Sequence, residues 1–257
     1  MKYTVRQFSA LAAAWILLLS FAASLHAVAQ TNAPKTIAVL YFENNSIVDK
    51  DKLDPLKKGL ADMMITELSK IKSLKVVERQ RIQSILEELN LNETDMVEKN
   101  TSQKMGKLLG AQVMLFGGFS NLFKDQMRID VRIVRTETGE TLKADEETGE
   151  LDDFLKMLQS LTKKIAADLD VKLSSDEQNM LEADNEGNFS GYVTYAKALN
   201  FEDQGRKFEK QGKLSDARSC YENAQKLYKK ALDESNGYEP AKQKADEMAA
   251  LITKLKK

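Results

Sequence analysis

Hydrophobic positions along residues 36–110 alternate between short continuous runs and helical stripes. Residues 36–43 and 74–78 are short apolar runs rich in branched side chains, which predicts a buried first strand and a second short strand. Between these runs, apolar side chains recur at steps of three and four, as on one face of a helix: Leu53, Leu56, Leu60, Met64 and Leu68. A further helix is predicted over residues 79–89. Thr101 or Ser102 would cap a short helix that carries Met105, Leu108 and Leu109, and Gly110 would close it in a left-handed conformation.

The next fifty residues have the alternation of a sheet. Residues 111–119 are apolar at successive positions, as in a central strand covered on both faces, and Gly117-Gly118 suggests a bulge. Residues 126–135 alternate apolar and charged side chains, which predicts a half-exposed strand. A turn containing Gly139 then leads to a polar edge strand over residues 142–147.

An amphipathic helix over residues 154–169 completes the order β-α-β-α-α-β-β-β-α. This order predicts an α/β (α+β) fold in which helices pack on a mixed sheet. Residues 174–188 are acidic and poor in apolar side chains, and the chain is helical from Tyr192 onward, with breaks near residues 211–212 and 235–237. We therefore expect an α/β domain over residues 30–172, an acidic linker or frayed helix over residues 173–190 and an all-α helical domain over residues 191–257.

Residues 1–29 have the three-part layout of a secretory signal peptide. Lys2 and Arg6 precede an apolar run over residues 10–23, and the small residues Ala27 and Ala29 precede the expected cut. The run is shorter than the ~20 residues that a membrane-spanning helix needs. We expect cleavage after Ala29 and a soluble periplasmic protein, with an uncleaved anchor as the alternative.

The rarest residues restrict the chemistry that the chain can perform. Its 257 residues include one histidine, His26, one tryptophan, Trp15, and one cysteine, Cys220. Signal cleavage would remove the histidine and the tryptophan, which excludes histidine-dependent triads and histidine-containing zinc sites. One cysteine allows no internal disulfide, and a formal net charge of −1 gives no indication of nucleic-acid binding.

Several short motifs, in order over residues 34–169, resemble the CsgG-type curli-assembly family and related periplasmic domains. They are the run from Ile37 to Phe42 followed by Asn44 or Asn45, then Gly59-Leu60-Ala61-Asp62, Val76-Val77-Glu78-Arg79, Leu86-Glu87-Glu88-Leu89, Leu108-Leu109-Gly110-Ala111, Phe116-Gly117-Gly118 and Thr138-Gly139-Glu140. The resemblance implies a role at the outer membrane, in secretion of other envelope proteins or in assembly with them.

The chain also departs from the pore-forming members of that family, which look like lipoproteins with inserted membrane hairpins. Gln30 stands where a lipid-modified cysteine would follow the cut. Residues 111–135 are long enough for a membrane hairpin, but Arg128 and Arg132 interrupt its second strand. We therefore favour a soluble periplasmic relative over a pore-lining one.

The helical domain looks like a tetratricopeptide helix pair. Large and small residues match that repeat in register: Phe201, Gly205, Phe208, Gly212, Ala217, Tyr221 and Ala224. Lys229 replaces the usual proline near the end of the repeat, and a generic helical hairpin is the alternative. By resemblance, partners would lie along the inner face of the first helix, which presents Leu199, Glu202, Arg206, Glu209 and Lys210.

Other constellations give no site. Gly106-Lys107 lacks the upstream glycine of a phosphate-binding loop, and the carboxylates at residues 87–88 and 145–147 are interpreted as solvated charge. The sequence therefore predicts no catalytic residue, metal or cofactor. It predicts a non-catalytic accessory protein of envelope assembly or secretion, with envelope proteins or a second copy as partners. The alternatives are a periplasmic activator that docks on a cell-wall synthase and an enzyme that uses carboxylates alone.

Overall fold

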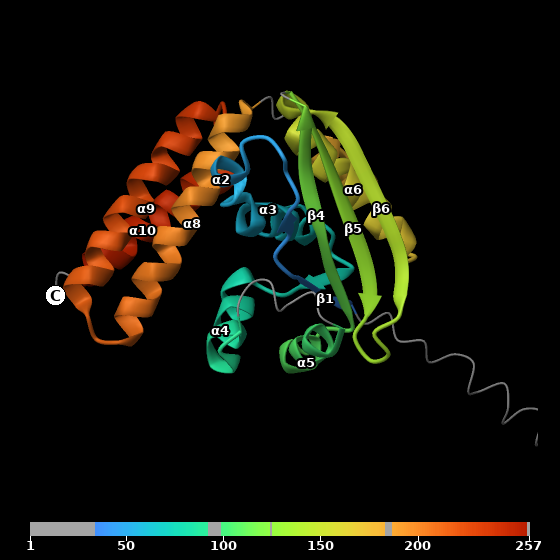
Figure 1. The fold of residues 1–257 in the computed structure, drawn as a ribbon, viewed down its shortest axis with the longest axis horizontal. Helices are drawn as coiled ribbons and strands as arrows, with labels where there is room; N and C mark the ends of the chain where they lie inside the picture. Colours follow the sequence, from blue (N-terminus) through green and yellow to red (C-terminus); the bar gives the residue numbers. More distant parts are fainter. Residues whose placement is uncertain (1–33, 92–98, 124, 183–186, 256–257) are drawn as a thin grey trace, which may run out of the picture. The chain divides into compact units, whose positions relative to one another are not determined.

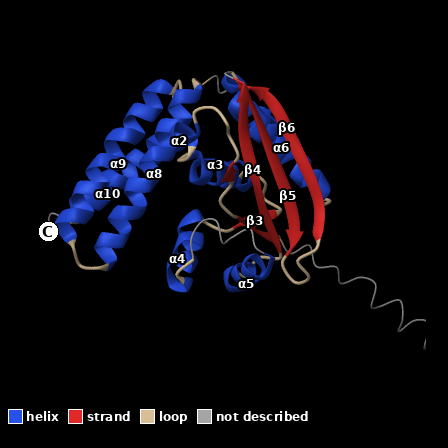
Figure 2. Ribbon diagram, viewed as in Figure 1, coloured by secondary structure: helices blue, strands red, loops and turns tan. Residues whose placement is uncertain are grey.

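The computed structural model describes residues 34–91, 99–123, 125–182 and 187–255, shown in Figures 1 and 2. The predicted signal segment, residues 1–29, lies outside the described residues. The described residues alternate strands and helices as far as Asp168, as the sequence predicts, and helices begin again at Ser175, before the predicted start near Tyr192.

Within the described residues, six strands form one mixed sheet. Its strands are β1 (Lys35–Val39), β2 (Glu43–Asn44), β3 (Leu74–Val76), β4 (Val113–Phe123), β5 (Gln126–Arg135) and β6 (Thr141–Glu150). The order is β3-β1-β4-β5-β6, with β2 also paired to β4. β1 is parallel to β3 and β4, whereas β5 is antiparallel to β4 and β6. β6 is therefore the polar edge strand that the sequence predicts.

One face of the sheet carries the core. The alternating apolar residues Met127, Ile129, Val131 and Ile133 of β5 are all buried, and α6 (Phe154–Asp168) covers this face together with α3 (Leu56–Ser69). Burying each large apolar side chain contributes ~1.5–3 kcal/mol before conformational entropy is subtracted. The short helix α2 (Lys50–Leu53) precedes α3.

Two helices follow β3, and the second ends as predicted. α4 (Arg79–Leu89) coincides with the predicted segment, and α5 (Lys99–Leu109) is followed by Gly110 at φ +65°. The predicted bulge at Gly117-Gly118 is wrong. Both glycines lie in regular register with β5, and the irregularity falls between Asn121 and Phe123. A Cβ on Gly117 would lie 1.8 Å from the carbonyl oxygen of Asp130, so this glycine permits close approach of two backbones.

Three long helices close the chain: α8 (Phe189–Lys210), α9 (Leu214–Glu234) and α10 (Glu239–Lys254). The two predicted breaks are confirmed, and glycines in left-handed conformations occur there at Gly212 and Gly237. α8 and α9 approach closely, since a Cβ on Gly205 would lie 2.5 Å from Cε1 of Tyr221. Ala217 of α9 is fully buried.

The predicted acidic linker contains a helix, α7 (Ser175–Glu182). Glu177 accepts hydrogen bonds from the backbone N–H groups of Ser174 and Lys72, both at 2.8 Å, and Leu181 is buried. The C-terminal helices also pack on the α/β part of the chain. A Cβ on Gly59 of α3 would lie 2.4 Å from Cβ of Ala196 of α8. Independent folding of the two predicted domains stays a prediction.

Candidate functional site

The predicted partner-binding residues lie on α8, and the chain itself covers two of them. Leu199 and Glu202 are 0% exposed. Arg206 and Glu209 are partly exposed, and Lys210 is exposed. Leu199 and Glu202 belong to the interior because α8 packs on the rest of the chain. Partner binding by Arg206, Glu209 and Lys210 stays a prediction.

Arg79, the first residue of α4, is the centre of a buried ion cluster. Its side chain is 2% exposed. Nε donates to Oδ1 of Asp62 at 3.0 Å, and Nη1 donates to both carboxylate oxygens of Asp203, at 2.8 and 3.0 Å. Burial alone would lower the pKa of Arg79, but the charges of Asp203, Tyr41, Asp62 and Glu202 hold that pKa well above its ordinary value. The guanidinium thus joins α3, α4 and α8.

Glu202 is the second centre of the cluster. Its Oε1 accepts hydrogen bonds from Arg206 and Gln80 at 3.1 Å and from Lys244 at 3.3 Å, and its Oε2 accepts one from Tyr228 at 2.7 Å. Burial raises the pKa of Glu202, but the charges of Lys244, Arg79 and Arg206 outweigh burial and lower that pKa to about 2. Glu202 is therefore ionised over the physiological range.

Two further contacts complete what we call the Arg79 cluster. Tyr195 donates to Asp62, and Lys58 donates to Asp203 at 3.0 Å. The charged members balance in sign: Lys58, Arg79, Arg206 and Lys244 against Asp62, Glu202, Asp203 and Glu247. A general acid or base needs a pKa near the working pH, and the pKa of Glu202 lies far below neutrality. The cluster therefore has the properties of a structural joint.

A groove with a volume of about 330 Å³ runs between α4 and the end of α8. Its walls include Gln83 and Glu87 of α4 and Arg206, Glu209 and Lys210 of α8. Lys210 reaches across to Oε2 of Glu87 at 3.0 Å. The hydrogen bond from Tyr221 and the nearby Lys254 lower the pKa of Glu209. The exposed part of the predicted partner-binding face is thus one wall of this groove.

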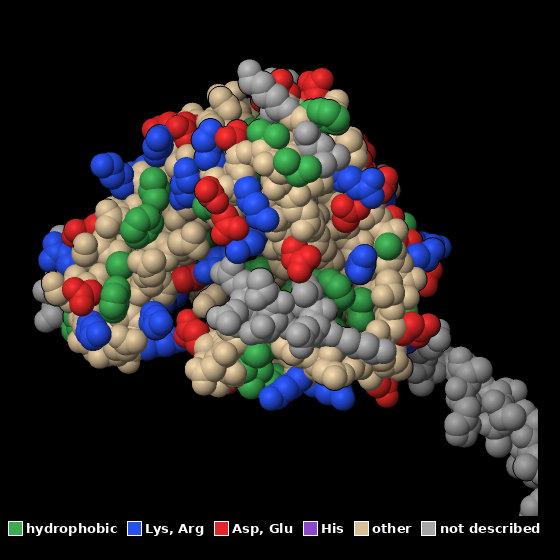
Figure 3. All heavy atoms as spheres, in the orientation of Figure 1, with side chains coloured by type: hydrophobic (Ala, Val, Ile, Leu, Met, Phe, Trp, Pro, Cys, Tyr) green, Lys and Arg blue, Asp and Glu red, His purple; other side chains and the backbone are tan. Residues whose placement is uncertain are grey.

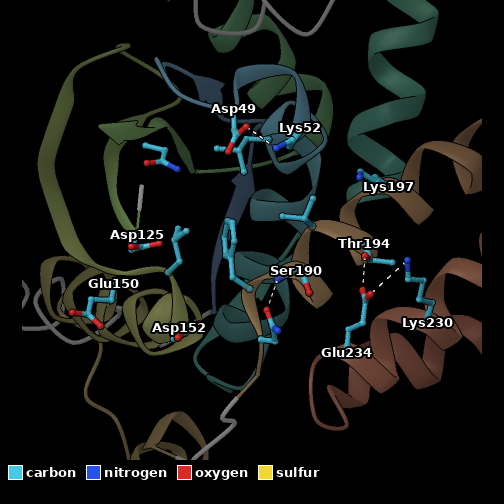
Figure 4. A pocket seen from close by; sticks show the side chains of 16 residues that line it. Asp49, Lys52, Asp125, Glu150, Asp152, Ser190, Thr194, Lys197, Lys230 and Glu234 are labelled. Atoms are coloured by element: carbon cyan, nitrogen blue, oxygen red, sulfur yellow. Dashed lines mark hydrogen bonds and ion pairs between the residues drawn. The ribbon is translucent and has the colours of Figure 1, made fainter. Parts of the chain in front are cut away.

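A larger cavity, with a volume of about 730 Å³, lies where the β4–β5 turn, α2, α8 and α9 meet. Figure 4 shows Asp125, Glu150 and Asp152 on the strand side and Lys197 on α8 across from them. At the margins, Lys52 pairs with Asp49 at 2.8 Å, and Glu234 accepts from Thr194 at 2.7 Å and pairs with Lys230 at 3.5 Å. Apolar side chains, including Leu53, Phe189 and Val193, also line the cavity.

A third depression lies on the outer face of the sheet, with a volume of about 780 Å³. Its charges include Arg128, Asp130 and Glu146, and Arg128 pairs with both carboxylates. One arginine thus faces two carboxylates, and its ion pairs with both of them engage these charges within the chain.

Metal and thiol chemistry find no support in the described part of the chain. Among residues 34–91, 99–123, 125–182 and 187–255, no group of three or more histidine, cysteine, aspartate or glutamate side chains is placed to hold a metal ion. Burial and Asp216 raise the pKa of the Cys220 thiol, which keeps it in its unreactive protonated form. No helix in the described ranges is long and apolar enough to cross a membrane.

Most of the Arg79 cluster was not predicted from the sequence. Arg79 is buried in ion pairs, whereas Arg81, two positions further along the same helix, is exposed. One signal was present: Asp62 interrupts the apolar run of α3 between Ala61 and Met63, and all three are buried. A buried carboxylate needs a charged or hydrogen-bonding partner, but the sequence does not say which.

Comparisons with known proteins give one family and several distant structures. The family model described as "Curli production assembly/transport component CsgG" matches residues 19–123. No curated protein matches the chain. The LpoB C-terminal domain from Salmonella enterica is 14% identical, with 50% of this chain and 91% of that chain covered and a TM-score of 0.33. Lipoprotein GNA1162 from Neisseria meningitidis is 16% identical, with 52% and 99% covered and a TM-score of 0.37. These structural likenesses are too distant to assign a function.

The family match covers the segment in which most of the quoted motifs occur. Its described part contains β1 to β4 and helices α2 to α5, including Asp62 and Arg79 of the ion cluster. That family is described as an assembly and transport component of curli production. Over residues 19–123 the chain is thus similar to the curli-assembly CsgG family, which confirms the resemblance seen in the sequence.

Proposed function

We propose that the protein is a non-catalytic accessory protein of envelope assembly or secretion, which acts in the periplasm or beside the outer membrane by binding other proteins. The observation that carries this proposal is the match of residues 19–123 to a family described as an assembly and transport component. The balanced charges of the Arg79 cluster agree with it, because its most buried carboxylate, Glu202, has a pKa of about 2 and is unsuited to acid–base catalysis near neutrality.

The α8–α9 pair would serve as the adaptor, in the manner of a tetratricopeptide pair. The Arg79 cluster fixes α8 against α3 and α4, so the groove between α4 and α8 has a defined shape. Lys210 is the member of the predicted face with the most exposed side chain, at 59%. A partner that binds in this groove would exchange the Lys210–Glu87 pair for contacts of its own.

Capture from native cells tests the proposal. The tagged chain is cross-linked in intact cells and purified from the envelope fraction, and bound proteins are identified by mass spectrometry. Lys210→Glu reverses a charge at the groove, and Lys207→Glu makes the same change at an exposed position of α8 outside it. We expect Lys210→Glu to reduce capture several-fold and Lys207→Glu to leave it unchanged, because local charge complementarity governs association.

The outcomes separate the alternatives. Recovery of an outer-membrane assembly or secretion component supports the proposal, and recovery of a cell-wall synthase identifies an activator instead. Sedimentation of the purified chain tests a second copy as the partner. A chain found in the cytoplasm, or one that captures no envelope protein, would overturn the proposal.

A further inference from the structure

The cavity beside the β4–β5 turn contains a buried polar group without a partner. Asn121 is 3% exposed and lines the cavity, and its backbone N–H donates to Oγ of Ser46 at 3.0 Å. Its side-chain oxygen Oδ1 accepts no hydrogen bond within the described residues. Buried acceptors in native proteins are nearly always satisfied, so this oxygen indicates a donor supplied from outside the chain.

The charges around the cavity indicate the sign of that donor. Asp49 and Glu234 already pair with Lys52 and Lys230. Asp125, Glu150 and Asp152 also line the cavity, and none of these three forms an ion pair with another described residue. Among the described residues that line the cavity, Lys197 is the remaining cation, so these carboxylates outnumber it. An incoming positive charge would relieve this excess.

Apolar side chains lie beside these charges. Leu53, Leu151, Phe189 and Val193 line the cavity. Outside the cavity lining, Ile47 and Phe123 are 80% and 68% exposed. Ile47 follows Ser46 and Phe123 lies two positions after Asn121, and the hydrogen bond between Asn121 and Ser46 holds the two chain segments together. Hydrophobic side chains at this end of the sheet are visible in Figure 3. Large exposed apolar side chains beside a cavity are typical of a binding surface.

We propose that this cavity binds an extended segment of a partner protein in which a lysine or arginine lies next to an apolar side chain. The cation would donate to Asn121 and to the carboxylates of Asp125 and Asp152, and the apolar side chain would pack against Phe123 and Ile47. A volume of about 730 Å³ is within the range of ~300–1,000 Å³ found for ligand sites. The inference rests on the proposed function, since it assumes that the protein acts through protein contacts.

Binding of matched peptides to the purified chain tests this inference. The probe is a fluorescent peptide that alternates arginine with leucine. One control replaces each arginine with citrulline, which keeps the shape and removes the charge, and another replaces each leucine with serine. We expect the arginine–leucine peptide to bind about ten-fold more tightly than either control, since a charge-assisted hydrogen bond and a buried apolar side chain each contribute that much. Spermidine distinguishes a small organic cation from a peptide.

Two variants place the binding in this cavity. Asn121→Leu removes the unpaired acceptor, and Asp125→Asn with Asp152→Asn removes two charges without changing shape. Each should weaken peptide binding about ten-fold, whereas Glu88→Gln, at an exposed position of α4 outside the cavity lining, should leave it unchanged. Asn121→Leu is not expected to unfold the chain, because it removes a buried group that has no partner. Should it fail to fold, the aspartate variant still decides.

Three results would overturn the inference: equal binding of the arginine and citrulline peptides, parent-like binding by the aspartate variant, or displacement of the peptide by equimolar spermidine. These results are independent of the proposed function. If an envelope partner is captured equally by the parent and the aspartate variant, the cavity inference fails and the proposed function stands. If the peptide binds as expected and no envelope partner is captured, the proposed function fails.

Discussion

Arg79 and Asp203 are 124 positions apart in the sequence and are joined through one guanidinium nitrogen, which donates to both carboxylate oxygens at 2.8 and 3.0 Å. Both side chains are buried, at 2% and 8% exposed. Removing two charges from water is costly, so such a pair contributes little net stability, but removing one partner leaves the other buried and uncompensated. The pair therefore makes the position of α8 sensitive to single substitutions.

Arg79→Met is expected to lower the free energy of unfolding by ~3–5 kcal/mol, because Asp62 and Asp203 would keep their burial and lose their shared cation. Urea denaturation followed by circular dichroism measures the loss. Arg81→Met, at an exposed position of the same helix, is the matched control and should change stability by less than ~0.5 kcal/mol. If the two variants lost the same free energy of unfolding, the buried ion pairs of Arg79 would not contribute more to stability than an exposed arginine does.

Glu202→Gln is expected to change the acid sensitivity of the protein. The folded-state pKa of Glu202 is lowered from 4.5 to about 2, so its ionisation contributes stability above pH 4.5, which is lost as the pH falls toward 2. The contribution is on the order of 3 kcal/mol. Urea unfolding at a series of pH values should therefore show the variant less stable near neutrality and the two proteins converging near pH 2. A gap between parent and variant that is constant across this range would contradict the assignment, and Glu88→Gln should run parallel to the parent.

Enlarging residues between α8 and α9 should damage the helical pair. Gly205→Ala should lower stability, because a Cβ at this position would lie 2.5 Å from Tyr221. The overpacking costs ~1–3 kcal/mol, which should outweigh the ~1 kcal/mol by which alanine is favoured over glycine in a helix. Ala217→Trp should cost more, because Ala217 is fully buried. Thermal unfolding compares both with Gln204→Ala, an exposed control on α8. Parent-like stability of Ala217→Trp would mean that the helices are not closely packed in solution.

Cleavage within the predicted linker, residues 173–190, tests the domain division. A specific protease site placed there should give an N-terminal fragment with mixed α/β circular dichroism. We expect the two fragments to co-elute on gel filtration, because α3 packs on α8 and Arg79 binds Asp203. With Arg79→Met they should separate. Cleavage that unfolds the entire chain would show that the division into two domains is wrong.

The helices and strands were predicted well because the spacing of apolar residues in a segment depends on the backbone conformation of that same segment. The alternation of residues 126–135 predicted β5, the stripe of Arg79–Leu89 predicted α4, and Gly110 marked the left-handed end of α5. Gly117 was misread for a related reason. A glycine within a strand can mark either a bulge or the close approach of another backbone. The structure shows that at Gly117 the reason is the nearby carbonyl of Asp130.

Long-range charge pairing was beyond the sequence. Glu202 and Arg206 are polar residues on a helix, which by pattern alone predicts an exposed face. Glu202 is nevertheless buried, and its burial depends on Arg79 of α4 and Lys244 of α10, which lie far away in the chain and leave no periodic signal. The unpaired side-chain oxygen of Asn121 could not be predicted from the sequence either, since its surroundings depend on how the β4–β5 turn packs.

The Arg79 cluster, which links α3, α4 and α8, has a consequence for the chain while it is being synthesised. Asp62 and Arg79 leave the ribosome long before Asp203, which follows Arg79 by 124 positions. During that interval, the surface that will receive α8 carries Lys58, Asp62 and Arg79, which water can solvate, instead of an entirely apolar patch. Incomplete chains that expose apolar surface tend to aggregate. The charges that make the folded protein sensitive to loss of one member of the Arg79 cluster would thus keep this surface of the incomplete chain hydrated until α8 to α10 are synthesised.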